Sequence, residues 1–368
     1  MTIRRVAVAG AGIVGLSTAW FLQERGLAVT VVDRTGPGAD RQDARASWGN
    51  AGWLAPALTL PLPEPSVLRY GLRSMFTPSS PVYVPPTLDP KLMRFLVDFA
   101  RHCSTRHWMA SLEVFAQVNK VALRAYDDLS VGGVTEQTRD ADPFLAAFTA
   151  ETERDHLLGE FDHVRATGGE VDYDILDADA VHSLEPLLGD KVRAGLRVRG
   201  QRFIDPPRFV ASLADAVRAR GGEVITGFDV TEVRDPGNGV VDVISAKGLD
   251  VSVDAVVLAT GARLNALAHG FGVRTPVQAG RGYSFSVVPD ELPKNPVYFP
   301  VQRVACTPLH DRFRIAGMME FRKPDAPLDP RRIQRSSTRP ARSCPKSTGL
   351  RGVRSGSARG RARPTDCR

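Results

Sequence analysis

The sequence has few cysteines and no long apolar segment. Its 368 residues include only four cysteines, with no Cys-x-x-Cys pair among them, which argues against a disulfide framework and indicates a reducing compartment. The seven histidines include no pair at i, i+4 beside a carboxylate, so no metal site is predicted. No run of eighteen apolar residues exists, and no transmembrane helix is expected. Because the first strand pattern begins at the N-terminus, no signal peptide is expected and the cytoplasm is the predicted location.

The basic residues are unevenly distributed along the chain. Residues 331–368 hold twelve of the 48 Lys and Arg residues and only one acid, Asp366. The remaining 330 residues carry 36 basic and 40 acidic side chains, a net charge of −4. The overall charge of +7 therefore belongs to the C-terminal segment, and the body of the protein is mildly acidic.

Residues 334–368 contain no aromatic side chain and no apolar periodicity, so disorder is predicted for this basic segment. Three explanations remain open: an out-of-frame reading of a GC-rich gene, which we favour, a basic arm that binds nucleic acid or anionic lipid, and a structured tail. A suitable choice of codons lets the segment be re-read as an amphipathic helix followed by a Thr-Pro-Asp sequence. Nucleic-acid binding is not expected, because aromatic residues for base stacking are absent.

The N-terminal residues form a dinucleotide-binding pattern. An apolar strand from Val6 runs into Gly10-x-Gly12-x-x-Gly15, a helical stretch follows, and a second apolar strand ends in Asp33. The glycines permit a tight turn, close approach of a pyrophosphate and close helix–strand packing. The helix N-terminus then faces the phosphates, and the acid accepts hydrogen bonds from a ribose.

The order of patterns predicts an α/β fold in which a Rossmann-like domain is interrupted by an α+β domain with an antiparallel sheet. Helices are expected at 90–101, 109–129, 151–166 and 206–220, and strands at 223–226, 229–233, 239–246, 275–288 and 312–319. A further apolar run, 254–261, is predicted to be a buried strand that meets a second glycine turn. The expected divisions are residues 1–55 and 201–270 for the nucleotide domain, 56–200 and 271–333 for the inserted domain, and 334–368 for the tail.

Several motifs together resemble one flavoprotein family. The strand that ends in Ala259-Thr260-Gly261, with the N-terminal pattern, resembles the FAD domain of the D-amino-acid oxidase-like oxidoreductases. The runs 46–52 (Ala-Ser-Trp-Gly-Asn-Ala-Gly), 281–284 (Arg-Gly-Tyr-Ser) and 314–320 (Arg-Ile-Ala-Gly-Met-Met-Glu) narrow the resemblance to D-amino-acid dehydrogenase small subunits. The resemblance covers residues 1 to about 333.

The resemblance implies that FAD is the cofactor and that its Rossmann-like domain is of the glutathione-reductase type. The implied reaction is oxidative deamination of D-amino acids to 2-oxo acids and ammonia, with hydride transfer to flavin N5. It also implies a quinone or respiratory-chain electron acceptor and a location in the cytoplasm or at the inner face of the cell membrane. Arg281 and Tyr283 are the candidates for contacts with the substrate carboxylate and amine. The implied FAD-binding residues are Gly10, Gly12, Ile13, Val14, Gly15, Asp33, Arg34, Ser47, Asn50, Ala51, Gly52, Val230, Thr260 and Gly261.

Two other functions stay open at this stage. The first is a glycine- or sarcosine-type amine oxidase, and the second is a non-catalytic remnant with a nucleic-acid-binding basic tail. The family's last segment, Thr-Pro-Asp-Gly followed by a glycine-rich turn and a helix towards the flavin, is not readable in this sequence. We therefore expect FAD binding and turnover by this chain to be impaired.

Overall fold

The computed structural model describes residues 2–36, 46–66, 82–85, 88–321 and 365–367. The chain divides into two compact units, each built from three separate segments. Unit 1 comprises Met1–Trp48, Tyr126–Gln137 and Asp205–Ala279, and unit 2 comprises Gly49–Ala125, Thr138–Ile204 and Gly280–Arg368. The chain therefore leaves and re-enters each unit, and each is described by itself below.

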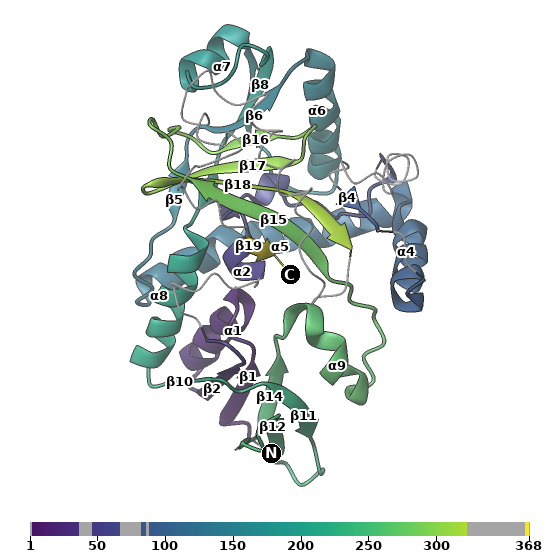
Figure 1. The fold of residues 1–368 in the computed structure, drawn as a ribbon, viewed down its shortest axis with the longest axis vertical. Coiled ribbons are helices and arrows are strands. Elements are labelled where there is room, and N and C mark those ends of the chain that lie inside the picture. The colour runs from purple at the N-terminus through teal and green to yellow at the C-terminus, as the bar shows by residue number, and fades with distance from the viewer. Residues whose placement is uncertain (1, 37–45, 67–81, 86–87, 322–364, 368) are drawn as a thin grey trace, which may run out of the picture. The chain divides into compact units, whose positions relative to one another are not determined.

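Unit 1 contains a parallel sheet with the strand order β10-β2-β1-β14 (Figure 1). Its strands are β1 (Arg5–Ala9), β2 (Ala28–Asp33), β10 (Glu223–Thr226) and β14 (Ala255–Leu258). Helix α1 (Ile13–Glu24) is the crossover from β1 to β2, as the N-terminal pattern predicts. The two central strands are apolar because their side chains are enclosed on both faces, and Ala7, Val8 and Val31 have no exposed surface.

The rest of unit 1 covers this sheet. Helix α8 (Pro206–Ala219) packs against α1, with proline in its first turn, where a missing backbone donor costs nothing. Strands β11 (Val230–Arg234), β12 (Val241–Ser245) and β13 (Asp250–Val253) form an antiparallel sheet whose buried residues share a core with β1 and β2. The short helices η2 (Gly261–Arg263), α9 (Leu264–Ala268) and η3 (His269–Phe271) follow β14.

The run 254–261 contains a strand, β14, but the prediction that this strand is buried is wrong. All four residues of β14 are partly exposed. Among the described strands, β14 pairs on one side only, with β1, so it lies at the edge of the described part of the sheet. Its apolar sequence resembles that of a central strand, and sequence alone did not distinguish the two.

Unit 2 contains a nine-stranded sheet with the order β19-β15-β18-β17-β16-β6-β8-β7, in which β4 also pairs with β18 (Figure 1). Most pairs are antiparallel, as predicted, but β16 with β6 and β18 with β4 are parallel, so the sheet is mixed. The strands are β4 (Val82–Tyr83), β6 (Phe144–Phe148), β7 (Tyr173–Asp177), β8 (Ala194–Val198), β15 (Gly280–Val287), β16 (Val297–Phe299), β17 (Val304–Leu309), β18 (Arg312–Phe321) and β19 (Thr365–Cys367).

A small sheet and several helices complete the described fold. The small sheet has the order β3 (Trp53–Leu54), β9 (Gln201–Phe203) and β5 (Arg139–Ala141). The helices are α2 (Ala46–Gly49), η1 (Pro56–Leu58), α4 (Pro90–His102), α5 (Thr105–Val131), α6 (Glu151–Ala166) and α7 (Ala178–Leu184). Helix α6 has the predicted bounds: it places Leu157, Phe161 and Val164 in the core of unit 2, and the Glu153 carboxylate accepts the backbone N–H of Thr149 at its start.

Most of the predicted C-terminal tail lies outside the described residues. Three of its residues, 365–367, are described and form β19, which pairs antiparallel with Gly282–Ser284 of β15. The sequence predicted no strand here. An edge strand offers unpaired backbone groups to any extended segment, whatever its side chains, so composition was a poor guide. None of the described helices is long and apolar enough to cross a membrane.

Candidate functional site

Two glycines in the turn after β1 have no room for a side chain. Gly10 has φ +116°, and a Cβ atom there would lie 2.4 Å from the carbonyl oxygen of Ala259. A Cβ on Gly15 would lie 1.9 Å from the carbonyl oxygen of Gly10. The glycines thus let β1, α1 and the end of β14 meet without intervening side chains, which leaves backbone groups to form the local surface.

The N-terminus of α1 is capped by a group from a distant segment. Gly12 is the N-cap residue and offers no side-chain acceptor, and α1 has no acidic residue in its first turn. The Ser47 hydroxyl accepts the backbone N–H of Ile13 at 3.0 Å, while Val14 is 67% exposed. A helix N-terminus with donors, a positive dipole end and no competing carboxylate suits an anion such as a pyrophosphate.

The Asp33 carboxylate, at the end of β2, is anchored between two loops. One oxygen accepts the backbone N–H of Ala11 at 2.7 Å, and the other accepts those of Thr35 at 2.8 Å and Gly36 at 3.1 Å. These bonds hold the glycine turn against the loop that follows β2. The neighbouring Arg34 is exposed.

The other predicted FAD-binding residues of unit 1 come from β11 and the end of β14. The hydroxyl oxygen of Thr260 is buried, and no described residue hydrogen-bonds to it. Gly261 is exposed with φ +55°, a conformation that glycine adopts easily. Val230 packs against the core that includes Ala9 and Val32.

These features of unit 1 fit a dinucleotide cofactor. The structure contains a turn that side chains would fill, an open helix N-terminus, a carboxylate at the end of the neighbouring strand and a buried hydroxyl with no described partner. Buried polar atoms normally have partners, so a bound group that completes the hydrogen bonding of Thr260 is chemically reasonable. All of these residues are among those that the glycine spacing and the family resemblance predicted.

Three further predicted FAD-binding residues belong to unit 2. The Asn50 side-chain oxygen accepts the backbone N–H of Gly52 at 2.6 Å. The carbonyl oxygen of Ala51 accepts the Thr307 hydroxyl at 2.8 Å, and that of Gly52 accepts the N–H of Ile204 at 2.8 Å. Strands β9 and β17 therefore fix this loop. No sequence pattern pointed to Thr307, because it lies more than 250 residues away along the chain.

The predicted substrate contacts, Arg281 and Tyr283, are buried on β15. Arg281 is 1% exposed and Tyr283 is 3% exposed. The Tyr283 hydroxyl donates to Oε1 of Glu320 at 2.9 Å, and Nη1 of Arg281 lies 4.0 Å from the same oxygen. Glu320 has no exposed surface, and the sequence predicted no role for it beyond the motif 314–320. It lies opposite Arg281 in the strand pairing of β15 with β18.

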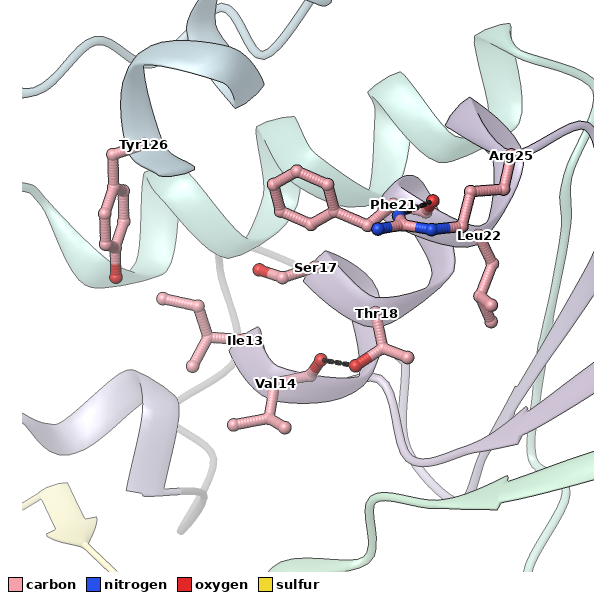
Figure 2. Close-up of a pocket in the computed structure, with 8 residues that line it drawn as sticks. All are labelled: Ile13, Val14, Ser17, Thr18, Phe21, Leu22, Arg25 and Tyr126. Atoms are coloured by element: carbon pink, nitrogen blue, oxygen red, sulfur yellow. Dashed lines mark hydrogen bonds between the residues drawn. The ribbon is translucent and has the colours of Figure 1, made fainter. Parts of the chain in front are cut away.

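A hollow of about 490 Å³ runs along α1 in unit 1 (Figure 2). It is lined by Ile13, Val14, Ser17, Thr18, Phe21, Leu22, Arg25 and Tyr126. Only Ile13 and Val14 among these belong to the predicted FAD-binding set. The remaining lining side chains are mostly apolar or already bonded to the α1 backbone, as Thr18 is to Val14 and Arg25 to Phe21. The hollow therefore adds no candidate for acid–base chemistry.

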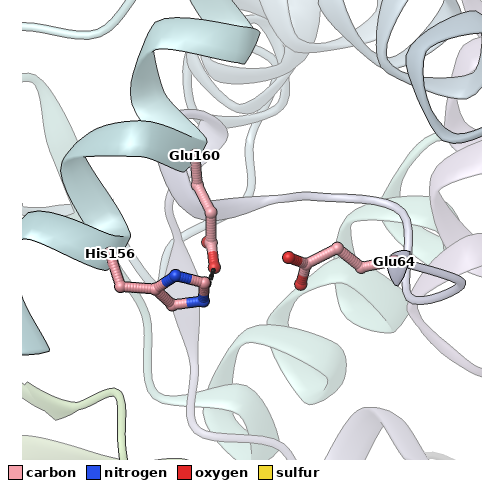
Figure 3. Close-up of side chains that lie close together, drawn as sticks. All are labelled: Glu64, His156 and Glu160. Carbon is pink, nitrogen blue, oxygen red and sulfur yellow. Dashed lines mark ion pairs between the residues drawn. The ribbon is translucent and has the colours of Figure 1, made fainter. Parts of the chain in front are cut away.

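Two carboxylates and a histidine converge in unit 2. Glu160 lies 3.6 Å from His156 one turn earlier on α6, and the possible ligand atoms of Glu64, His156 and Glu160 all lie within 4.8 Å of one another (Figure 3). Burial, together with the charge of Glu64, raises the pKa of Glu160 to about 7, while Arg303 opposes this shift. The sequence missed this group because Glu64 is far from α6 along the chain. Such a group can hold a metal ion, although none was predicted.

The chain matches the family model of FAD dependent oxidoreductases, DAO, over residues 5–366. It is 32% identical over 340 residues to a D-amino acid dehydrogenase of Cereibacter sphaeroides, which covers 89% of this chain and 75% of the relative.

Solved glycine oxidases share the fold. That of Bacillus cereus aligns with a TM-score of 0.62 and 21% identity over 94% of this chain and 81% of its own. That of Geobacillus kaustophilus aligns with a TM-score of 0.64 and 18% identity over 93% of this chain and 78% of its own.

Proposed function

Because the chain belongs to the DAO family of FAD-dependent oxidoreductases, we propose that it oxidises D-amino acids to 2-oxo acids and ammonia. The observation that carries the choice of substrate is the 32% identity to a D-amino acid dehydrogenase over 89% of the chain. The glycine turn supports the FAD part of the proposal, because Gly10 and Gly15 leave room only for backbone beside the expected pyrophosphate.

FAD supplies the hydride-accepting chemistry when bound, and the chain's own residues bind and orient the cofactor and the substrate. The backbone at Gly12, Ile13 and Val14 would hold the pyrophosphate at the N-terminus of α1. For this, Ser47 has to share or release the N–H of Ile13 that it now accepts. Asp33, which accepts backbone N–H groups of Ala11, Thr35 and Gly36 and the Thr35 hydroxyl, would bind the ribose, as in other dinucleotide sites.

The remaining predicted residues would complete the FAD site. Thr260 offers its buried hydroxyl, and Gly261, Val230 and Arg34 offer backbone or exposed side-chain groups. In unit 2, the loop Asn50–Gly52 offers a small-residue backbone that β9 and β17 hold in place. A flat ring needs such close backbone approach.

On the substrate side, Arg281 would attract the carboxylate and Tyr283 would face the amine. Both side chains are buried on β15, so a substrate would meet them in an enclosed polar environment where electrostatic interactions are strong. Water exclusion there favours loss of a hydride over side reactions with solvent.

The electrons would leave the reduced enzyme for a quinone or another respiratory-chain acceptor, at the inner face of the cell membrane or in the cytoplasm. Nucleic acid is not a proposed partner.

The test is a comparison of enantiomers. Purified protein supplemented with FAD is mixed with D- or L-amino acids and a redox dye, and dye reduction, 2-oxo acid and ammonia are measured. We expect the three products only with D-amino acids, in equal amounts. Oxygen consumption with glycine or sarcosine would instead support the amine oxidase alternative. No turnover, together with salt-sensitive binding of DNA that is lost on deleting residues 334–368, would support the non-catalytic alternative.

A further inference from the structure

Glu320 is a buried carboxylate that neither the family motif nor the predicted site explains. It is on β18 directly opposite Arg281 of β15, and it has no exposed surface. We propose that Glu320 is a positioning residue that orients the Tyr283 hydroxyl for recognition of the substrate amine. This inference rests on the proposed function, since it concerns the amino acid that the enzyme would bind.

The contacts of Glu320 determine the direction of the Tyr283 hydroxyl. A tyrosine hydroxyl has one hydrogen and two lone pairs. In the structure that hydrogen is donated to Oε1 of Glu320 at 2.9 Å. Its oxygen can then only accept further hydrogen bonds. An amino-acid ammonium group is only a donor, so it is complementary to a tyrosine oriented in this way.

Arg281 lies beside the carboxylate of Glu320 and carries the opposite charge. Removing a lone carboxylate from water is unfavourable, and an opposite charge nearby compensates. Nη1 of Arg281 lies 4.0 Å from the same Oε1 that Tyr283 contacts, and its side chain is 1% exposed. The three groups therefore form one cluster in which a single carboxylate oxygen faces both partners.

The local strand geometry gives a second reason to connect this cluster with function. The pairing of β15 with β18 is regular up to Gly282, which is opposite Met319, but Tyr283 is opposite Gly317. This register shift, which has the pattern of a β-bulge, falls between the two predicted substrate contacts. Bulges bend a strand, redirect side chains and occur often beside active sites.

The experiment is a double-mutant cycle on the holoenzyme with Glu320→Gln, Tyr283→Phe and the combined variant. The glutamine keeps the size of the side chain but can donate to the tyrosine oxygen. We expect at least a tenfold increase in KM for the D-amino acid in Glu320→Gln, with kcat changed less than threefold. In the Tyr283→Phe background, Glu320→Gln is expected to have no further effect on KM, because Glu320 acts through the hydroxyl. Glu320→Asp is expected to restore part of the lost affinity.

Glu185→Gln is the matched control. Glu185 is also a buried carboxylate of unit 2, 1% exposed, and it accepts backbone N–H groups of Lys294 and Asn295. We expect this variant to lower the melting temperature without changing KM. A Glu320→Gln variant that loses stability but keeps its KM, or KM effects that add in the double variant, would overturn the inference.

A second measurement separates this inference from the proposed function. 2-Aminoisobutyrate carries the amine and carboxylate of an amino acid but has no α-hydrogen to lose, so its dissociation constant can be measured by calorimetry without turnover. The same tenfold loss and the same non-additivity in the dissociation constant support the role of Glu320 even if no D-amino acid is oxidised. Equal affinity of wild type and Glu320→Gln for this probe overturns it.

Discussion

At Gly10 both the backbone torsion and the neighbouring chain exclude a side chain. The residue has φ +116°, and its Cβ would contact the Ala259 carbonyl at 2.4 Å. Gly26 also has a positive φ, +77°, but nothing lies within 4 Å of its Cβ. A comparison of substitutions at these two positions therefore distinguishes the cost of a left-handed backbone from the cost of a steric clash.

We expect Gly10→Ala to lower the free energy of unfolding by roughly 2–5 kcal/mol, since backbone strain and overpacking combine. Gly26→Ala is expected to cost only about 1 kcal/mol, from the strain alone. Urea unfolding of both variants, followed by circular dichroism, measures the difference. Equal losses would show that the approach of Ala259 does not matter for stability.

The raised pKa of Glu160 couples the stability of unit 2 to pH. The folded-state pKa is about 7 against an ordinary value of 4.5, so the folded protein binds more protons than the unfolded chain between these values. This contribution to stability is complete below about pH 4.5 and is lost as the pH rises through 7.

We expect Glu160→Gln to remove that loss, so that the melting temperature of the variant falls less between pH 5 and pH 8 than that of the wild type. Glu151→Gln is the control, because Glu151 lies on the same helix with 74% of its side chain exposed. Parallel curves for Glu160→Gln and wild type would contradict the assignment.

At the scale of elements, the long helices and the βαβ unit could be predicted with nearly correct bounds. Helix α6 and strand β10 have the expected residues, because apolar periodicity, caps and flanking glycines all agree there. The short strands β5, β7 and β9 and the helix α7 were not predicted. Strands of three to five residues carry too little periodicity, and their partners lie far along the chain.

Helix α8 is connected to the segment after α5 through one serine. The Ser212 hydroxyl oxygen accepts the backbone N–H groups of Thr135 at 2.7 Å and Glu136 at 3.0 Å, and Ser212 is 8% exposed. We expect Ser212→Ala to cost about 1–3 kcal/mol of unfolding free energy, because two partly buried hydrogen bonds lose their acceptor.

Ser111→Ala provides the comparison for that variant. The Ser111 hydroxyl donates only to a carbonyl of its own helix, that of His107, at an exposed position, and its loss should change stability by less than about 0.5 kcal/mol. Chemical denaturation of Ser212→Ala and Ser111→Ala measures the two changes in unfolding free energy. Similar small effects would mean that water replaces the Ser212 bonds.

At the scale of the whole molecule, cofactor binding should stabilise unit 1. We propose that the glycine turn, the α1 N-terminus and Asp33 bind the ADP half of FAD, which riboflavin lacks. We expect FAD at about 100 times its dissociation constant to stabilise the fold by about 2.7 kcal/mol, ADP to compete with it, and riboflavin to stabilise far less. Thermal melts with each ligand test this, and equal stabilisation by riboflavin would contradict it.

The basic C-terminal segment has its own test. We expect sequencing of the gene across codons 320–368 and beyond to find an inserted or deleted base before codon 334, with a Thr-Pro-Asp-Gly sequence restored in the other frame. A clean frame through Arg368 would instead make the basic segment a genuine part of the chain.

The sequence by itself determined the cofactor class and the first strand–helix–strand unit. The pattern consists of Gly10, Gly12, Gly15 and Asp33, which all belong to one strand–helix–strand unit. Their spacing along the chain therefore fixes where they lie in that unit. Local patterns of this kind can be read directly from sequence, which is why the glycine turn between β1 and α1 was predicted residue by residue.

Only the tertiary structure decided which distant groups meet. Glu320 lies beside Arg281 and Tyr283 because of the register of β15 and β18. The Thr307 hydroxyl donates to the carbonyl oxygen of Ala51, 256 residues earlier in the chain, and β14 lies at the edge of the described part of its sheet. Strand register and sheet order depend on the packing of the whole unit. No local pattern encodes them, so the buried polar cluster emerged only from the fold.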